Sequence, residues 1–164
     1  MLSSNLYSNP HGIRFRAQTV RLRNSTGSAT VVGGVYQLDM SHTGGATTYT
    51  GTDRTSVFGS IDEVDATGMN MYPLVVATEV VAAASDGEFV ISGVGPILCQ
   101  GPGGTALTEV LHAEAALVGL DSDAHATAQE VQRVVAIPLE ATATATLTLL
   151  DCLFDGMGLG FQQT

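Results

Sequence analysis

Histidine and carboxylate side chains that could bind a cation gather in one part of this 164-residue sequence. His112 and Glu114 come first, and Asp121, Asp123 and His125 follow in a short polar stretch. Structural zinc sites use His and Cys ligands at short, fixed spacings, and neither histidine has such a neighbour. We therefore expect solvated turn residues here and no bound metal.

A second acidic group consists of Asp62, Glu63 and Asp65, just before a glycine at position 68. A calcium loop needs regularly spaced oxygen ligands followed by a distal Glu, and this pattern stops after Asp65. We favour a solvated acidic loop, which could also receive arginines from a neighbouring molecule.

The sequence contains no recognisable set of catalytic groups. It has no lysine, which excludes Walker-type phosphate loops, Schiff-base chemistry and serine–lysine hydrolases. No Gly-x-Ser-x-Gly elbow occurs, and the glycines at 156, 158 and 160 lack the final spacing of a dinucleotide-binding loop. We predict a non-enzymatic protein without a cofactor.

Cys99 and Cys152 both stand in apolar, strand-like runs. The first residues lack the continuous apolar segment of an export signal, so an oxidising compartment is not expected. We therefore predict two buried free thiols rather than a disulfide. No apolar run is long enough to cross a bilayer, and no membrane contact is expected.

Charge is divided unevenly along the chain. The formal net charge is −10, yet residues 1–23 contain four arginines and no acid, so residues 24–164 carry −14. The candidate binding residues of this basic N-terminal arm are Arg14, Phe15, Arg16, Arg21 and Arg23. The arginines pair at i and i+2, a spacing that places each pair on one face of an extended chain, with Phe15 on the opposite face.

A basic arm on an acidic body predicts contact with an acidic protein neighbour, which includes another copy of the chain. The alternative is an edge strand whose arginines face water. Nucleic acid is not expected as a partner, because the acidic body would repel phosphate.

The composition favours β-strands, because Ala, Val, Gly and Thr dominate it and aromatic residues make up 5%. We therefore expect strands to position the candidate residues named above. The centre of the predicted fold is the run from Leu74 to Gly101, in which an Asp86-Gly87 turn separates two apolar stretches. Gly93 predicts a bulge or a close backbone approach. In the N-terminal strand the apolar positions change parity, which predicts a bulge or bend near Gln18–Thr19 if both parts face one core.

The remaining elements are predicted from periodicity. Residues 41–56 have the composition of a long surface loop, and Thr105–His112 favours about one and a half helical turns. The run Val131–Leu139 is a predicted strand that must place Pro138 at an edge or an end. The alternating Ala/Thr run Ala141–Leu150 is the clearest predicted strand.

We expect an all-β fold: a small antiparallel barrel or sandwich with at most one short helix and an extended N-terminal arm. The predicted organisation is a basic arm with the first strand in residues 1–23, a β domain in residues 24–153, and a flexible Gly-rich tail in residues 154–164.

Three segments follow one another in the chain: PLVVATEVVAAASDGEFVISGVGPILC (residues 73–99), ALVGLDSDAHATA (116–128) and VVAIPLEATATATLTLL (134–150). Their order of strand, small-residue turn, Gly-punctuated strands, Ala/Thr-rich connection and last strand resembles the small cement, or decoration, proteins of tailed-phage capsids. The resemblance covers residues 30–153 and lies in composition and order. Pro138, the basic arm and the loop at 41–56 depart from it.

The resemblance implies a structural virion protein, commonly a homotrimer, on the outer surface of an expanded icosahedral capsid, and present in the host cytoplasm during assembly. The implied partners are the major capsid protein, whose subunits it would bridge, and other copies of itself. A ligand that binds only the assembled shell stabilises that shell by mass action. The alternatives are another virion component, such as a tail or head-fibre base protein, or a carbohydrate-binding β-sandwich module, which the scarcity of aromatic residues disfavours.

Overall fold

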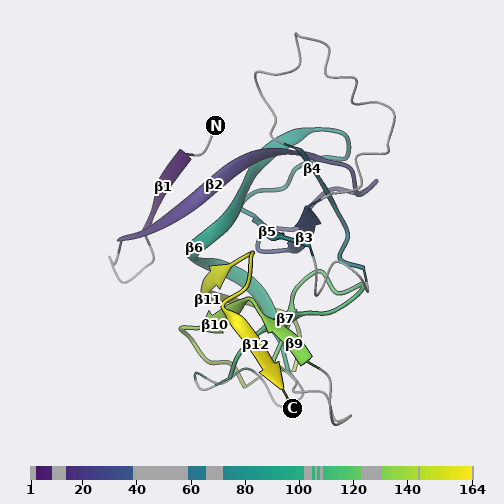
Figure 1. Ribbon diagram of the computed structural model, residues 1–164. Helices are drawn as coiled ribbons and strands as arrows, with labels where there is room; N and C mark the ends of the chain where they lie inside the picture. Colours follow the sequence, from purple (N-terminus) through teal and green to yellow (C-terminus); the bar gives the residue numbers. More distant parts are fainter. Residues whose placement is uncertain are drawn as a thin grey trace.

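The computed structural model describes residues 3–8, 14–38, 59–65, 72–101, 105, 107, 109–122, 131–143 and 145–163 (Figure 1). These residues contain no helix, and therefore none that could span a membrane, so the predicted all-β fold is confirmed. The described strands are β1 (Ser3–Ser8), β2 (Arg14–Asn24), β3 (Val35–Leu38), β4 (Gly59–Asp62), β5 (Leu74–Ala77), β6 (Asp86–Gln100), β7 (His112–Ala113), β8 (Leu120–Asp121), β9 (Val131–Val134), β10 (Ala136–Pro138), β11 (Thr148–Asp155) and β12 (Gly160–Gln163).

Five of these strands close into a small barrel. Along the order β2–β4–β3–β5–β6 each strand pairs with the next, and β6 pairs with β2 again. The β2–β4 pair is parallel, as is β6–β8 elsewhere, so the sheet is mixed and not purely antiparallel as predicted. Every strand of the ring contributes to the apolar interior, which consists of Val20, Leu22, Tyr36, Ile61, Val75, Ala77, Val81 and Phe89.

Strand β6 leaves the barrel halfway along its length and continues into a second sheet. Up to Ser92 it pairs with β2 and β5, and from Ser92 onward it pairs with β11, which in turn pairs with β10. Gly93 lies at this change of partners with φ +126°, a conformation that glycine adopts without a steric penalty. The bulge predicted at Gly93 lies instead at Ile91 against β2, and the ladder with β11 runs through Gly93 without a register shift.

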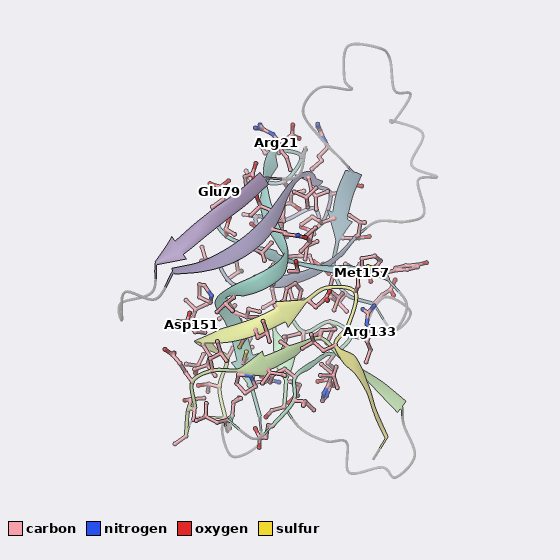
Figure 2. All side chains as sticks on the ribbon, turned by 60° about the vertical axis from the view of Figure 1, so that its left-hand side comes forward. Arg21, Glu79, Arg133, Asp151 and Met157 are labelled. Atoms are coloured by element: carbon pink, nitrogen blue, oxygen red, sulfur yellow. The ribbon has the colours of Figure 1, made fainter. Side chains whose placement is uncertain are left out.

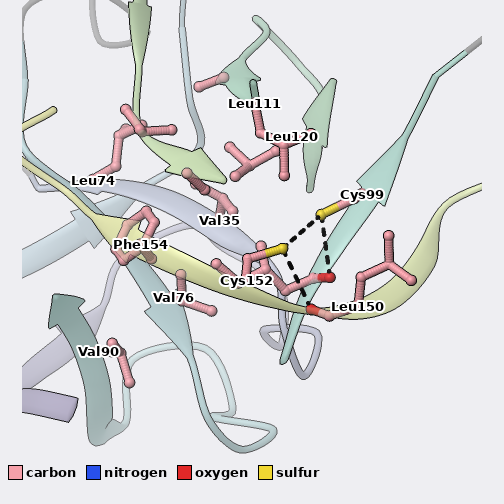
Figure 3. Packing of buried hydrophobic residues seen from close by; sticks show 14 of the residues in the cluster. Val35, Leu74, Val76, Val90, Cys99, Leu111, Leu120, Leu150, Cys152 and Phe154 are labelled. Carbon is pink, nitrogen blue, oxygen red and sulfur yellow. Dashed lines mark hydrogen bonds between the residues drawn. The ribbon is translucent and has the colours of Figure 1, made fainter. Parts of the chain in front are cut away.

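A second core fills the space between the outside of the barrel and the second sheet (Figure 3). Strands β3 and β5 serve both cores: Tyr36 and Val75 belong to the barrel interior, whereas Val35 and Val76 belong to the second core. All four residues of β5 are buried, which explains its continuous apolar sequence. Other members of the second core are Leu74, Val90, Ile97, Cys99, Leu111, Leu120, Val135, Leu150, Cys152 and Phe154.

The register of β2 against β6 shifts between Gln18 and Thr19, at the predicted position. The extra residue is Ile91 on β6, which lies between the partners of these two residues. The parity change in β2 has another cause than the one expected, because Ala17 belongs to the second core and Val20 to the barrel interior. The two halves of β2 therefore bury opposite faces.

The chain reversal before β6 lies earlier than predicted. The turn is at Ala83–Ala84, where Ala84 has φ +59°, and Asp86 and Gly87 already belong to β6. A side chain at Gly87 would overlap the side chain of Val81 inside the barrel. This glycine is therefore required for packing and not for the turn.

The helical turns predicted at Thr105–His112 are absent from the described residues of that stretch. Leu111 donates its backbone N–H to the Ala136 carbonyl and accepts from the Val135 N–H, both at 2.9 Å, and β7 begins at the next residue. The side chain of Leu111 is fully buried in the second core. Tertiary burial in an extended conformation thus overrides the local helical preference.

The alternating run Ala141–Leu150 is a strand only from Thr148 onward, contrary to the prediction. Before that point Thr142 makes an isolated bridge to Thr105, and Ala143 and Ala145 are exposed. Ala and Thr bury little apolar area, so their alternation does not secure a strand that has no partner. The prediction for Pro138 is confirmed, since it ends the edge strand β10.

The Gly-rich end is part of the fold and not a flexible tail. Strand β12 pairs antiparallel with β9, and the Gly156 N–H donates to the Ile91 carbonyl at 2.9 Å. The domain boundaries drawn after residues 23 and 153 fall inside β2 and β11. The loop predicted at residues 41–56 lies outside the described residues.

Candidate interaction surface

The basic arm forms a β-hairpin at one edge of the sheet, and in Figure 1 it extends away from the body. Strand β1 pairs with β2 from Ser3↔Thr19 to Ser8↔Arg14, whereas β6 pairs with β2 only from Gln18 onward. Residues 5–8 and 14–17 therefore form a two-stranded segment, which we call the ribbon. Among the described strands, this part of β2 is paired with β1 alone.

The five predicted binding residues are divided between two environments. Arg14, Phe15 and Arg16 lie in the ribbon, which ends at Ala17, a buried residue of the second core. The register partners of the two arginines are the uncharged Ser8 and Leu6. The ribbon thus contains positive charge that no acidic register partner on β1 opposes.

Arg21 and Arg23 are exposed and lie farther along β2, opposite Glu88 and Asp86 of β6. The Arg23 Nη1 atom is 3.7 Å from Asp86 Oδ1, and the arginine side chain is 53% exposed. Such a solvated pair contributes about 1 kcal/mol or less. These two arginines support the β2–β6 pairing as cross-strand partners of acids.

A second candidate surface, which the sequence patterns did not predict, lies on the outer side of β6, β11 and β10. In β11 the buried residues Leu150, Cys152 and Phe154 alternate with Leu149 and Leu153, which are 45% and 39% exposed. The register places Leu153 between Val94 of β6 and Ile137 of β10, and Leu149 beside Leu98. We call this set the apolar face: Val94, Pro96, Leu98, Ile137, Leu139, Leu149 and Leu153.

Asp151 (labelled in Figure 2) lies between Leu149 and Leu153 on β11 and has the same parity, so it belongs to the middle of the apolar face. Its register partner on β6 is Pro96, and its carbonyl accepts the Leu139 N–H at 2.8 Å. A sheet with one side on a core normally presents polar residues on the other side. The sequence signal was the run of leucines in TLLDCLFD, where Leu149 and Leu150 occupy both parities and so predict two apolar faces.

The histidine and carboxylate groups do not assemble into a metal site within the described residues, where no set of three potential ligands occurs. His112, predicted as a solvated turn residue, is 2% exposed and lies opposite Asp121 in the β7–β8 pair. Asp123 and His125 lie outside the described residues. Asp62, Glu63 and Asp65 are exposed, as predicted for an acidic loop.

The two thiols are buried and free, as predicted. Their sulfur atoms are 3.6 Å apart in the second core (Figure 3), and each thiol also contacts the carbonyl two residues before it. The hydrogen bond with Cys99 and burial raise the pKa of the Cys152 thiol. A protonated, inaccessible thiol is a poor nucleophile, so this pair does not form a reactive centre.

A hollow of about 270 Å³ lies beside the barrel, lined by residues 26–36, 63–64 and 116–118 in part. Its titratable lining groups are Tyr36 and Glu63. The Tyr36 hydroxyl accepts the Val31 N–H at 2.8 Å, and burial raises the pKa of this tyrosine. A phenol held in its protonated form beside one exposed carboxylate does not make a nucleophile and base pair.

The chain matches no protein-family model, no curated protein and no solved structure. Function must therefore be inferred from the ribbon and the apolar face.

Proposed function

We propose that the protein is a structural virion component that decorates the outside of a tailed-phage capsid, as a homotrimer. It stabilises the expanded icosahedral shell by bridging subunits of the major capsid protein. The observation that supports this most is the basic ribbon extending from an acidic body. An extended, charged element suits contact with a second protein and has no evident use in an isolated domain.

The physical basis is mass action. A protein that binds only the expanded lattice lowers the free energy of that state, and the contacts add up over the many symmetric positions of a shell. Individual contacts can then be modest. The described residues are consistent with this role because the ribbon and the apolar face are two candidate binding surfaces on one β scaffold.

The test is cosedimentation of the purified protein with expanded and unexpanded shells of the major capsid protein encoded in the same genome. We expect saturable binding to expanded shells alone, and a higher melting temperature of the decorated shell. Failure to bind either shell would reject the proposal, and equal binding to both would reject a role in stabilising the expanded state.

Two double variants test the ribbon at matched charge. Arg14→Ala with Arg16→Ala removes two charges from the ribbon, and Arg21→Ala with Arg23→Ala removes two that face Glu88 and Asp86. We expect the first to weaken shell binding about tenfold and the second about twofold or less. Deleting residues 1–23 is not a usable test, because β2 is a wall of the barrel.

A further inference from the structure

We infer that the apolar face of one copy is the binding surface for the basic ribbon of a second copy. This goes beyond the proposed capsid role, because the contact joins copies of this chain to each other and can be measured without a shell.

The apolar face needs a partner. Leu149, Leu153 and Ile137 are 45%, 39% and 36% exposed on adjacent strands, and Leu139 beside them is 44% exposed. A contiguous exposed apolar patch on a protein surface is a feature of protein interaction sites. The ribbon of the same copy leaves β6 at Gln18, and these side chains stay exposed in its presence.

Electrostatic repulsion disfavours a contact between the apolar faces of two copies. A symmetric contact of that kind would bring the two copies of Asp151 together at its centre. Residues 24–164 carry −14, so the bodies also repel at longer range. The favoured occupant is therefore a positively charged segment with apolar side chains.

The ribbon is the part of this chain with that chemistry. Residues 1–23 contain four arginines and no acid, and on the ribbon face that carries Arg14 and Arg16 the register also places Leu6, whereas Tyr7 and Phe15 belong to the opposite face. A two-stranded segment without further sheet partners is marginally stable alone, so packing on an apolar surface would stabilise it. Its arginines would meet Asp151.

The ribbon and the apolar face are different surfaces of one chain. A contact between them is therefore heterologous. When each copy binds the next through this contact, the copies form a closed ring if the rotation from one copy to the next divides a full turn evenly. Self-association through this contact would thus give a cyclic oligomer of the kind proposed for the capsid-bound form.

The first experiment measures mass in solution by analytical ultracentrifugation up to about 100 μM. We expect the wild type to form a closed oligomer and Leu153→Glu to be monomeric over the same range. The matched control is Val80→Glu, because Val80 is 65% exposed in the connection between β5 and β6 and lies outside the apolar face. A monomeric wild type, or a Leu153→Glu oligomer with native circular dichroism, would overturn the inference.

A charge exchange keeps the inference testable if Leu153→Glu fails to fold. We expect Asp151→Arg to weaken association about tenfold and the added change Arg16→Asp to restore most of it. Absence of rescue, with both variants folded, would reject the contact between these two residues. If the protein forms this oligomer but cosediments with neither expanded nor unexpanded shells, the capsid role is rejected and the inference about self-association still holds.

Discussion

The sulfur atoms of Cys99 and Cys152 are 3.6 Å apart although neither cysteine is the register partner of the other. Cys99 pairs with Thr148 and Cys152 with Gly95, an offset of four residues along β6. In a flat sheet such an offset corresponds to about 13 Å, so β6 and β11 must coil strongly around the second core.

The thiols should be protected in the native protein. Both are fully buried, so we expect their reaction with 5,5′-dithiobis(2-nitrobenzoic acid) to be at least about 100-fold slower than in the unfolded chain. In denaturant, both should react together. Rapid modification of one thiol in native buffer would contradict the buried arrangement.

Stability should fall at alkaline pH. The pKa of Cys152 is raised above its ordinary value of 9.0, so the folded thiol stays protonated where the unfolded thiol ionises. The unfolded state then binds fewer protons, and the free energy of unfolding falls above pH 9 by about 1.4 kcal/mol per pH unit. Below pH 9 this contribution is fully present.

Urea unfolding at pH 8, 9, 10 and 11 measures this slope, and Cys152→Ala should reduce it. The buried Tyr36, whose pKa is also raised, should steepen the decline above its ordinary value of 10.0. A Cys152→Ala variant with the same slope as the wild type would show that the thiol is not the source.

Gly156 should tolerate no side chain. A Cβ atom there would overlap the carbonyl oxygen of Leu74, a backbone atom held in place by its own strand. We expect Gly156→Ala to lower the free energy of unfolding by more than about 3 kcal/mol. Gly95→Ala is the matched control, because a Cβ at Gly95 meets nothing within 4 Å and should change stability by less than about 1 kcal/mol. Similar losses in both variants would contradict the crowding at Gly156.

Arg133 should be a structural arginine. It is 5% exposed, its Nη2 atom donates to the Tyr72 carbonyl at 2.6 Å, and burial lowers the pKa of its guanidinium (labelled in Figure 2). Arg133→Ala should lower the free energy of unfolding by about 2 kcal/mol, because the Tyr72 carbonyl loses its charged donor. The exposed Arg21 serves as the control, and Arg21→Ala should cost less than about 0.5 kcal/mol. A Tm unchanged by Arg133→Ala would show that water replaces the guanidinium.

Sequence patterns predicted the fold best where the signal depends on a residue and its immediate neighbours. The apolar run of β5 and the edge position of Pro138 followed from local chemistry, whereas the register shift at Gln18–Thr19 was expected at the right place for a different reason. Prediction was wrong where burial depends on distant partners. The Ala/Thr run before Thr148 alternates without a neighbour to pair with, and Leu111 is extended because the second core requires it there.

The candidate site shows the same division. Four arginines without acids are visible in the sequence, but the opposition of Arg21 to Glu88 and of Arg23 to Asp86 depends on the register with a strand about sixty residues away. That register leaves Arg14 and Arg16 as the pair without acidic register partners. The apolar face was missed because Leu149 and Leu153 appear as core residues until β11 is known to have only one covered side.

Strand β6 runs without interruption from the wall of the barrel to the edge of the apolar face. Tension applied at the N-terminal hairpin would enter β6 through its ladder with β2 and reach β11 along one backbone, without crossing a loop. A protein anchored at both surfaces would therefore resist stretching as one continuous unit. It would fail when the hydrogen bonds between two strands break, and not by movement at a hinge.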